Sequence, residues 1–227
     1  MRPAVVLLSG GLDSATCLGW ALREGFTTHA LTVNYGQRHA IEVARAVEVA
    51  RLIGAASHRV LAIDLSFLPG SALTDRTVAV PKARGAAEIG SGIPPTYVPA
   101  RNTVLLACAL SWAESLGARD LVIGVNAVDY SGYPDCRPTF LRAFEALAAS
   151  GTKAGAEGDA WRVHAPLVDL SKAEIVRRAV AWGVPYASTL SCYDPGVGGC
   201  PCGACDACLI RARGFREAGV IDRAPGI

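Results

Sequence analysis

The stretch V-V-L-L-S-G-G-L-D-S-A-T-C-L, from Val5 to Leu18, decides the fold of this chain. Four apolar residues come first, a Ser-Gly-Gly turn follows, and a helical pattern begins directly after the turn. A short apolar run bounded by glycine is typical of a buried parallel strand. Gly10 and Gly11 allow backbone angles that other residues avoid, and they let a ligand approach the main chain closely. We therefore predict a strand, a ligand-binding turn and a helix in this order.

The start of the predicted helix is suited to an anion, with phosphate as the usual ligand. Free backbone N–H groups point out of a helix N-terminus, and the helix dipole favours negative charge there. Ser9 and Ser14 add hydroxyl donors. A carboxylate that faces a phosphate needs a cation between them, so Asp13 indicates Mg²⁺. The alternative interpretation is an ordinary glycine turn that joins a strand to a helix.

The loop differs from two common phosphate-binding motifs, because no Lys follows the glycines and the spacing is not G-x-G-x-x-G. It resembles the S-G-G-x-D-S loop of the ATP pyrophosphatases. That resemblance implies a loop that holds the β,γ-pyrophosphate of ATP while the α-phosphorus is attacked, with AMP and pyrophosphate as products. The residues then expected to contact ATP are Leu8, Ser9, Gly10, Gly11, Leu12, Asp13, Ser14, Ala15, Thr16, Cys17 and Leu18.

Composition narrows the class of protein. The chain has 227 residues, of which 51% are apolar, enough for one well-buried α/β domain with a small appendage. The formal net charge of +2 argues against a dedicated nucleic-acid surface. No apolar run reaches the length of a membrane span, and the N-terminus enters the first predicted strand directly, so we expect neither a membrane segment nor a signal peptide. Eight cysteines without an export signal indicate a reducing cytoplasm and metal ligands.

Strands and helices alternate along most of the chain, which predicts an α/β fold with a Rossmann-like parallel sheet flanked by helices. Ligands in such sheets lie beyond the carboxyl ends of the strands, where the Gly10–Gly11 turn falls. After the first strand, the further strands are expected at 29–33, 59–63, 121–125 and 162–165. The helices are expected at 15–23, 40–52, 102–116, from a cap at Thr139 to about Ala149, and at 172–182 after a cap at Ser171. Residues 151–159 are expected to form a loop.

Two segments do not follow this alternation of strands and helices. Residues 65–100 are rich in proline and glycine, and so long an irregular stretch is typical of a lid, a binding loop or disorder. The tail from Ser191 carries five of the eight cysteines within 17 residues. We therefore predict a nucleotide-binding domain over 1–188, with an irregular insertion at about 65–100, and a zinc-binding module over 189–227.

The cysteine tail has the spacing of a metal site. Cys202, Cys205 and Cys208 are three residues apart, and two overlapping C-x-x-C steps bring thiolates around one tetrahedral ion. Cys192 is the preferred fourth ligand, because Cys200 is separated from Cys202 by a single proline. A closed site of four thiolates has a structural role. A redox or disulfide cluster and an iron–sulfur cluster are the alternatives.

Three further places carry candidate polar groups. The segment after the fourth strand contains Asp129, Tyr130, Tyr133, Asp135 and Arg137: aromatic rings that can stack on a heterocycle, carboxylates that can accept the paired N–H edge of guanine, and an arginine for a substrate carboxylate. A solvated surface loop is the equal alternative. Arg101 begins an apolar helix and can cap it or bind an anion. Lys172 begins another helix and can reach the phosphates or remain solvated.

Together, S-G-G-L-D-S, N-Y-G-Q-R-H, Y-V-P-A-R-N, D-Y-S-G-Y-P-D-C-R and C-G-A-C-D-A-C-L-I-R resemble the 7-cyano-7-deazaguanine synthase family, over nearly the whole chain. The resemblance implies ATP, Mg²⁺, one structural zinc and a homodimer, with 7-carboxy-7-deazaguanine and ammonia as substrates. It implies a carbon–nitrogen ligase that adenylates the carboxylate, forms the amide and then the nitrile, in queuosine biosynthesis.

The resemblance also assigns roles to residues. It places phosphate chemistry on Asp13, Ser14 and Lys172, and zinc on Cys192, Cys202, Cys205 and Cys208. Cys200 is an additional cysteine, and Leu190 stands where the family often has Trp. The alternatives are a tRNA sulfurtransferase that uses the same loop and a cysteine-bound cluster, or a nucleotide-binding sensor without catalytic activity.

Overall fold

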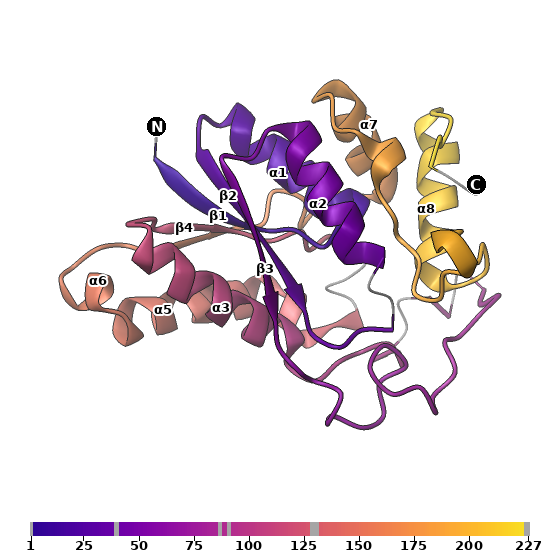
Figure 1. The fold of residues 1–227 in the computed structure, drawn as a ribbon, viewed down its shortest axis with the longest axis horizontal. Coiled ribbons are helices and arrows are strands. Elements are labelled where there is room, and N and C mark those ends of the chain that lie inside the picture. Colours follow the sequence, from indigo (N-terminus) through magenta and orange to yellow (C-terminus); the bar gives the residue numbers. More distant parts are fainter. Residues whose placement is uncertain (1, 39–40, 86–87, 90–91, 128–131, 225–227) are drawn as a thin grey trace.

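The computed structural model describes residues 2–38, 41–85, 88–89, 92–127 and 132–224 (Figure 1). Its sheet has five strands in the order β3-β2-β1-β4-β5, and every neighbouring pair is parallel. The strands are β1 (Pro3–Leu7), β2 (Thr27–Asn34), β3 (Ser57–Ala62), β4 (Asp120–Val122) and β5 (Arg162–His164). The predicted α/β fold with a parallel sheet is confirmed.

Helices cover both faces of this sheet (Figure 1). On one face lie α1 (Leu12–Arg23), α2 (Ile41–Ile53), α7 (Lys172–Ala181) and α8 (Asp206–Ala218). On the other lie α3 (Arg101–Ser115), α5 (Pro138–Gly151) and the short α6 (Lys153–Ala156). Three single turns of 3₁₀ helix complete the described elements: η1 (Pro134–Cys136), η2 (Tyr186–Ser188) and η3 (Val197–Gly199).

Strand β1 shows why the sequence requires two helical layers. Its side chains alternate, so Ala4 and Val6 join the apolar cluster under α1 and α2, while Val5 and Leu7 join the cluster under α3 and α5. All four are buried, and burial of one Val or Leu side chain is worth about 1.5–3 kcal/mol. A strand that is apolar on both faces therefore takes the centre of the sheet.

The sheet reverses its winding at β1, which pairs with β2 on one side and with β4 on the other. In open parallel sheets a crevice forms outside the carboxyl ends of the strands at such a point. The turn at Gly10–Gly11 follows β1 directly, and Gly124–Asn126 follow β4. The topology thus brings two loops, which are more than 110 residues apart in sequence, to one edge.

Glycine is required at two positions here because the backbones approach each other closely. Gly10 has a φ of +87°, and a Cβ there would lie 2.6 Å from the carbonyl oxygen of Glu42 in α2. A Cβ on Gly124 would lie 3.1 Å from the backbone nitrogen of Ser14. These two glycines let α2 and the loop after β4 pack directly on the Ser9–Ser14 loop.

The irregular segment 65–100 is held by the cysteine tail. Lys82 pairs with Cys205 in an isolated antiparallel bridge, and the backbone nitrogen of Ala83 donates to the carbonyl oxygen of Ala204 at 2.8 Å. Ala72 and Val80 are buried in a small cluster with Leu190 and three of the cysteines, Cys192, Cys205 and Cys208. Residues 72–83 therefore pack against the cysteine tail.

Several predicted boundaries are wrong. Thr139 does not cap α5, which begins at Pro138 with Arg137 in the capping position, because proline fits the first turn of a helix. Residues 153–156 form α6, capped by the Thr152 hydroxyl, inside the segment predicted to be a loop. The cap at Ser171 is confirmed as a full capping box with Glu174. Within the described residues, no helix has the length and hydropathy to cross a membrane.

Candidate active site and cysteine cluster

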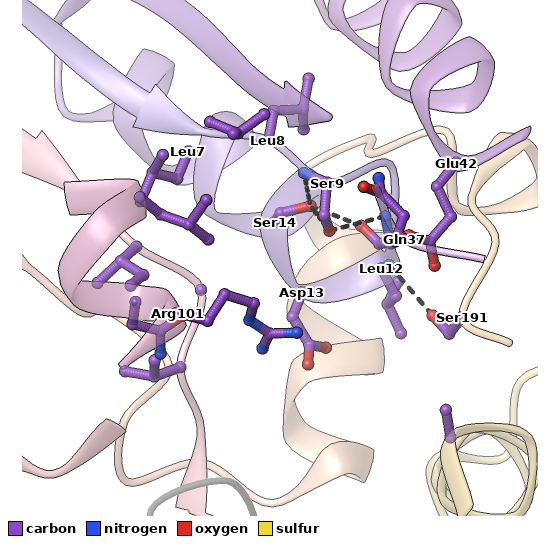
Figure 2. A pocket seen from close by; sticks show the side chains of 18 of the residues that line it. Leu7, Leu8, Ser9, Leu12, Asp13, Ser14, Gln37, Glu42, Arg101 and Ser191 are labelled. Carbon is purple, nitrogen blue, oxygen red and sulfur yellow. Dashed lines mark hydrogen bonds between the residues drawn. The ribbon is translucent and has the colours of Figure 1, made fainter. Parts of the chain in front are cut away.

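A cavity of about 280 Å³ opens at the carboxyl edge of the sheet (Figure 2). The ends of β1, β2 and β4 form its floor, and the start of α3 and the segment 190–193 form its walls. From the predicted loop it takes Leu8, Ser9, Gly11, Leu12, Asp13 and Ser14. The run from Ala15 to Leu18 is buried in α1 and is not among the described lining residues. The part of the loop before α1 thus faces the cavity.

The loop is held by its own hydroxyl groups. The backbone nitrogen of Ser9 donates to Ser14 Oγ at 3.1 Å, and the two serine hydroxyls lie 3.0 Å apart. The backbone nitrogen of Gly11 donates to Ser9 Oγ at 3.3 Å. These bonds fix the conformation of the turn in the absence of a ligand, and they hold the backbone at the start of α1 in place. The turn is therefore a candidate anion cradle, because a helix N-terminus favours negative charge.

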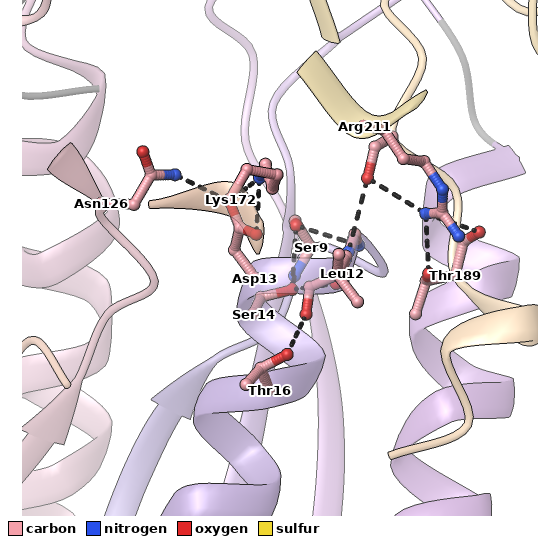
Figure 3. Close-up of polar contacts among 11 residues, drawn as sticks. Ser9, Leu12, Asp13, Ser14, Thr16, Asn126, Lys172, Thr189 and Arg211 are labelled. Atoms are coloured by element: carbon pink, nitrogen blue, oxygen red, sulfur yellow. Dashed lines mark hydrogen bonds and ion pairs between the residues drawn. The ribbon is translucent and has the colours of Figure 1, made fainter. Parts of the chain in front are cut away.

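Asp13 links three elements beside this cradle (Figure 3). Lys172 Nζ, from the first residue of α7, lies 2.7 Å from each carboxylate oxygen of Asp13. Asn126 Nδ2, from the loop after β4, donates to Asp13 Oδ2 at 2.8 Å. The side chains of Lys172 and Asp13 are only 15% and 20% exposed. The structure thus brings Asp13, Ser14 and Lys172 to one cavity, with the lysine ammonium group fixed at its edge.

A second pair of charged groups lines the cavity: Arg101, which the sequence analysis proposed as an anion-binding residue, and Glu42, which it missed. Glu42 lies in the first turn of α2. Burial raises the pKa of Glu42 to about 7, and the positive charge of Arg101 opposes that rise. Arg101 Nη1 donates to the Tyr35 hydroxyl at 3.2 Å, and Figure 2 shows its guanidinium extending into the cavity on the side of Asp13. The cavity therefore holds a carboxyl group that titrates near neutral pH.

The residues predicted to bind the base take different positions. Tyr133 lines the cavity, and its hydroxyl lies 2.8 Å from Thr96 Oγ1. Asp135 is buried, and its carboxylate accepts the backbone N–H of Asn102 at 2.9 Å. Arg137 is exposed, and it does not belong to the described cavity lining. Asp129 and Tyr130 lie outside the described residues. Of the residues predicted to bind the substrate, Tyr133 lines the cavity, and so does Arg101.

The cysteine tail folds into a compact cluster. The sulfur atoms of Cys192, Cys202, Cys205 and Cys208 all lie within 4.8 Å of one another. Cys200 is exposed and is not one of the four. Cys192 and Cys205 are almost fully buried, with exposures of 1% and 0%. The four residues that spacing and resemblance predicted are therefore the four that converge.

The surroundings of these sulfur atoms suit a bound cation. Backbone N–H groups of Asp194 and Cys202 donate to Cys192 Sγ at 3.4 and 3.2 Å, and that of Tyr193 donates to Cys205 Sγ at 3.4 Å. N–H donors to sulfur stabilise thiolates, which are the ligand form. Four convergent cysteine sulfur atoms match a structural metal site.

The chain is similar to one named family over nearly all of its length. The family model described as "Queuosine biosynthesis protein QueC" matches residues 3–219. The 7-cyano-7-deazaguanine synthase of Anaeromyxobacter sp. (strain Fw109-5) is 64% identical over 97% of this chain and 94% of its own length. That of Thiobacillus denitrificans is 59% identical over 98% of this chain and 97% of its own length.

A solved structure supports the fold. The NMN synthetase from Francisella tularensis aligns with a TM-score of 0.50 at 18% identity, covering 98% of this chain and 74% of that one. At this identity the likeness concerns the fold, which is of the adenine nucleotide alpha hydrolase type. The parallel sheet and its flanking helices are shared features.

Proposed function

The chain belongs to the queuosine biosynthesis protein QueC family, and we infer from this that it is a 7-cyano-7-deazaguanine synthase, a carbon–nitrogen ligase of queuosine biosynthesis. We propose that it converts 7-carboxy-7-deazaguanine and ammonia to the nitrile at the expense of ATP. The observation that carries this proposal is the cavity in which the Ser9–Ser14 loop, Lys172 and Arg101 meet. It combines an anion cradle with two cationic side chains at one edge of the sheet.

The first half-reaction requires activation of a carboxylate. A carboxylate oxygen attacks the α-phosphorus of ATP, pyrophosphate leaves, and an acyl-adenylate forms. Negative charge develops on the phosphate oxygens, and the N–H groups of the loop, the Ser9 and Ser14 hydroxyls and the Lys172 ammonium can stabilise it. Ammonia then displaces AMP to give the amide.

The second half-reaction repeats the activation on the amide. The amide oxygen attacks the α-phosphorus of another ATP, and pyrophosphate leaves. The nitrogen then loses its two protons as the C–O bond breaks, which gives the nitrile and AMP, so the oxygen ends in the phosphate group of AMP. Both steps need the same cradle and the same positioning of acceptor and nucleotide. We therefore propose that this cavity serves both activations.

Two metal ions belong to the proposal. Mg²⁺ prefers oxygen ligands, and Asp13 would supply a carboxylate to it, with Lys172 and Asn126 fixing the orientation of that carboxylate. When bound, this ion neutralises phosphate charge. Zn²⁺ would be held by Cys192, Cys202, Cys205 and Cys208, whose sulfur atoms already converge, and it would stabilise the fold of the module.

We further propose that the enzyme is a cytoplasmic homodimer that binds no nucleic acid. The resemblance to the family supports the dimer, and the near-neutral charge supports the absence of a nucleic-acid surface. Light scattering combined with size-exclusion chromatography measures the subunit number directly. A monomer at micromolar concentration would contradict the dimer without affecting the catalytic assignment.

The decisive experiment is incubation of the purified protein with ATP, 7-carboxy-7-deazaguanine and ¹⁵N-ammonia, followed by mass spectrometry. We expect labelled amide and labelled nitrile, together with AMP and pyrophosphate. Lys172→Met serves as the matched variant, because it keeps the length of the side chain and removes its charge. Release of AMP without labelled nitrile, or nitrile formation without ATP, would contradict the proposal.

A further inference from the structure

A buried arginine in α8 ties the last part of the chain to the nucleotide loop. The side chain of Arg211 is 3% exposed, and it forms a two-point ion pair with Asp222, at 2.6 Å from Nε and 3.0 Å from Nη2. Nη2 also donates to the carbonyl oxygen of Tyr186 at 3.1 Å. Asp222 therefore fixes the orientation of the guanidinium. The Nη1 edge of the guanidinium is directed at the residues between η2 and the cysteine cluster.

That other edge holds the segment 189–191 (Figure 3). Arg211 Nη1 donates to Thr189 Oγ1 at 2.9 Å, and it lies 3.4 Å both from the carbonyl oxygen of Thr189 and from Ser191 Oγ. All five N–H donors of the guanidinium are thus directed at acceptors. An arginine satisfied in this way acts as a rigid support for the segment that it holds.

The supported segment lies directly against the turn after β1. The backbone nitrogen of Leu190 donates to the carbonyl oxygen of Gly10 at 3.0 Å. Ser191 Oγ lies 3.5 Å from the backbone nitrogen of Leu12, and a Cβ on Gly11 would lie 3.6 Å from it. Ser191 lines the cavity, and Figure 2 shows its hydroxyl facing the first residues of α1. Its hydroxyl therefore stands beside the N–H groups of the anion cradle.

The contacts of Ser191 decide how its hydroxyl is used. Its oxygen has two lone pairs, which face the N–H of Leu12 and the guanidinium of Arg211, so the hydroxyl hydrogen is left to donate elsewhere. Phosphate oxygens accept hydrogen bonds and cannot donate them. The contact between the Leu12 N–H and Ser191 Oγ is long, at 3.5 Å, and therefore weak. A phosphate oxygen that accepts from Ser191 can replace Ser191 Oγ as the acceptor of this N–H at little cost in free energy.

We propose that Ser191, oriented by the buried Arg211–Asp222 pair, donates its hydroxyl to the phosphate groups of ATP at the Ser9–Ser14 loop. This inference rests on the proposed use of ATP at the loop. It adds a binding residue from outside the nucleotide-binding motif, and it makes Arg211 a positioning residue that acts through Ser191. Since Arg211 lies in α8, whose first turns contain Cys208, the cysteine module completes the nucleotide site.

The test is the affinity for ATP, measured by calorimetry on the purified full chain without the deazaguanine substrate. Ser191→Ala should weaken binding of Mg·ATP by about tenfold, because a net hydrogen bond to a charged group is lost. Ser191→Thr keeps the hydroxyl and should retain most of the affinity. Ser188→Ala is the matched control: this serine ends η2 directly before segment 189–191, its hydroxyl donates to Glu48 at 3.0 Å, and it lies outside the described lining, so the variant should bind ATP as the parent does.

Steady-state kinetics distinguishes loss of an ATP contact from a general structural change, because only the first raises the KM for ATP selectively. Ser191→Ala should raise the KM for ATP and leave the KM for the deazaguanine acid, the melting temperature and the metal content unchanged. Equal ATP affinity in the parent and Ser191→Ala proteins would overturn the inference, and so would an equal loss in Ser188→Ala. If the variant still produced nitrile with unaltered ATP dependence, this inference would fail while the proposed function would stand.

Discussion

Asp135 offers a sharp separation between a structural role and a substrate-binding role. Its carboxylate is 7% exposed and accepts the backbone N–H of Asn102, the second residue of α3, at 2.9 Å. Asn102 Nδ2 donates in return to the carbonyl oxygen of Asp135 at 3.0 Å. This N–H is one of the four that a helix start leaves without an intrahelical partner. We therefore predict that Asp135 mainly stabilises the start of α3, which carries Arg101 into the cavity.

The expected magnitude follows from the burial of both partners. Asp135→Ala leaves a buried N–H without an acceptor, which costs about 1–3 kcal/mol, a range that overlaps the cost of losing an N-cap. For a chain of this length that loss lowers the melting temperature by about 2–12 °C. Asp135→Asn keeps one acceptor oxygen and loses only the favourable charge at the helix dipole, about 0.3–1 kcal/mol.

The assay is urea unfolding followed by circular dichroism, combined with KM values for both substrates. Arg137→Ala is the control, because Arg137 belongs to the same loop and is exposed, so its free energy of unfolding should stay within about 0.5 kcal/mol of the parent value. If Asp135→Ala unfolded like the parent and raised only the KM for the deazaguanine acid, Asp135 would be a substrate ligand and the capping argument would be refuted.

Three further predictions follow from the cavity and the cysteine cluster. Asp13→Asn should lower kcat/KM for ATP at least about tenfold, or about 1.4 kcal/mol of transition-state stabilisation, with unchanged circular dichroism; normal turnover would contradict this. Cys202→Ala should lose the metal and melt earlier, whereas Cys200→Ala should keep close to one zinc per chain by mass spectrometry; stoichiometric iron with visible absorbance would instead support a cluster. Glu42→Gln should be more stable than the parent at pH 8 and lose that advantage toward pH 5, in melting curves taken across this range.

The sign of the Glu42 prediction follows from linkage. The pKa of Glu42 is raised to about 7 in the folded protein, so the native state binds a proton more tightly than the unfolded chain does. The stabilisation of the folded protein by protonated Glu42 is fully present at low pH, and it is lost as the pH rises through 7. Glu24→Gln, at an exposed position, is the control and should show no such pH dependence. If the melting temperatures of Glu42→Gln and the parent changed with pH in the same way, the pKa of this carboxyl group would not be raised by burial.

The features that the sequence predicted well are those that local geometry determines. The Ser9–Ser14 loop needs only a strand, two glycines and a helix start in succession, and the cysteine spacing places three thiols on one short stretch. The structure adds the reason why Cys192 joins them: two backbone N–H groups donate to its sulfur, while Cys200, directly after η3, is exposed.

The features that the sequence analysis missed depend on sheet order. Lys172 and Asp13 are 159 residues apart, and only the position of α7 beside α1 shows that their side chains meet. Glu42 and Ser191 reach the cavity because α2 and the segment before the cysteine cluster both pack on the turn after β1. Asp135 shows the converse problem, since a polar residue in a loop has the same appearance in sequence whether it faces a ligand or caps a helix.

The charges in the cavity bear on the proposed binding of two anionic substrates. Its described lining contains two carboxyl groups, Asp13 and Glu42, against three cationic side chains, Arg38, Arg101 and Lys172. Arg38 donates to the carbonyl oxygens of Asp75 and Val78, at 3.2 and 2.8 Å, so part of its guanidinium is engaged with segment 65–100.

Entry of a polyanionic nucleotide and an anionic acid therefore adds more negative charge than the side chains offset. Nearby negative charge favours the protonated form of a carboxyl group. The pKa of Glu42 is about 7 without ligands, so we expect bound anions to favour its protonated form. A protonated carboxyl group donates a hydrogen bond, as the amide of glutamine also does. Glu42→Gln should therefore retain ATP binding, and the pH dependence of its affinity should be weaker than that of the parent enzyme.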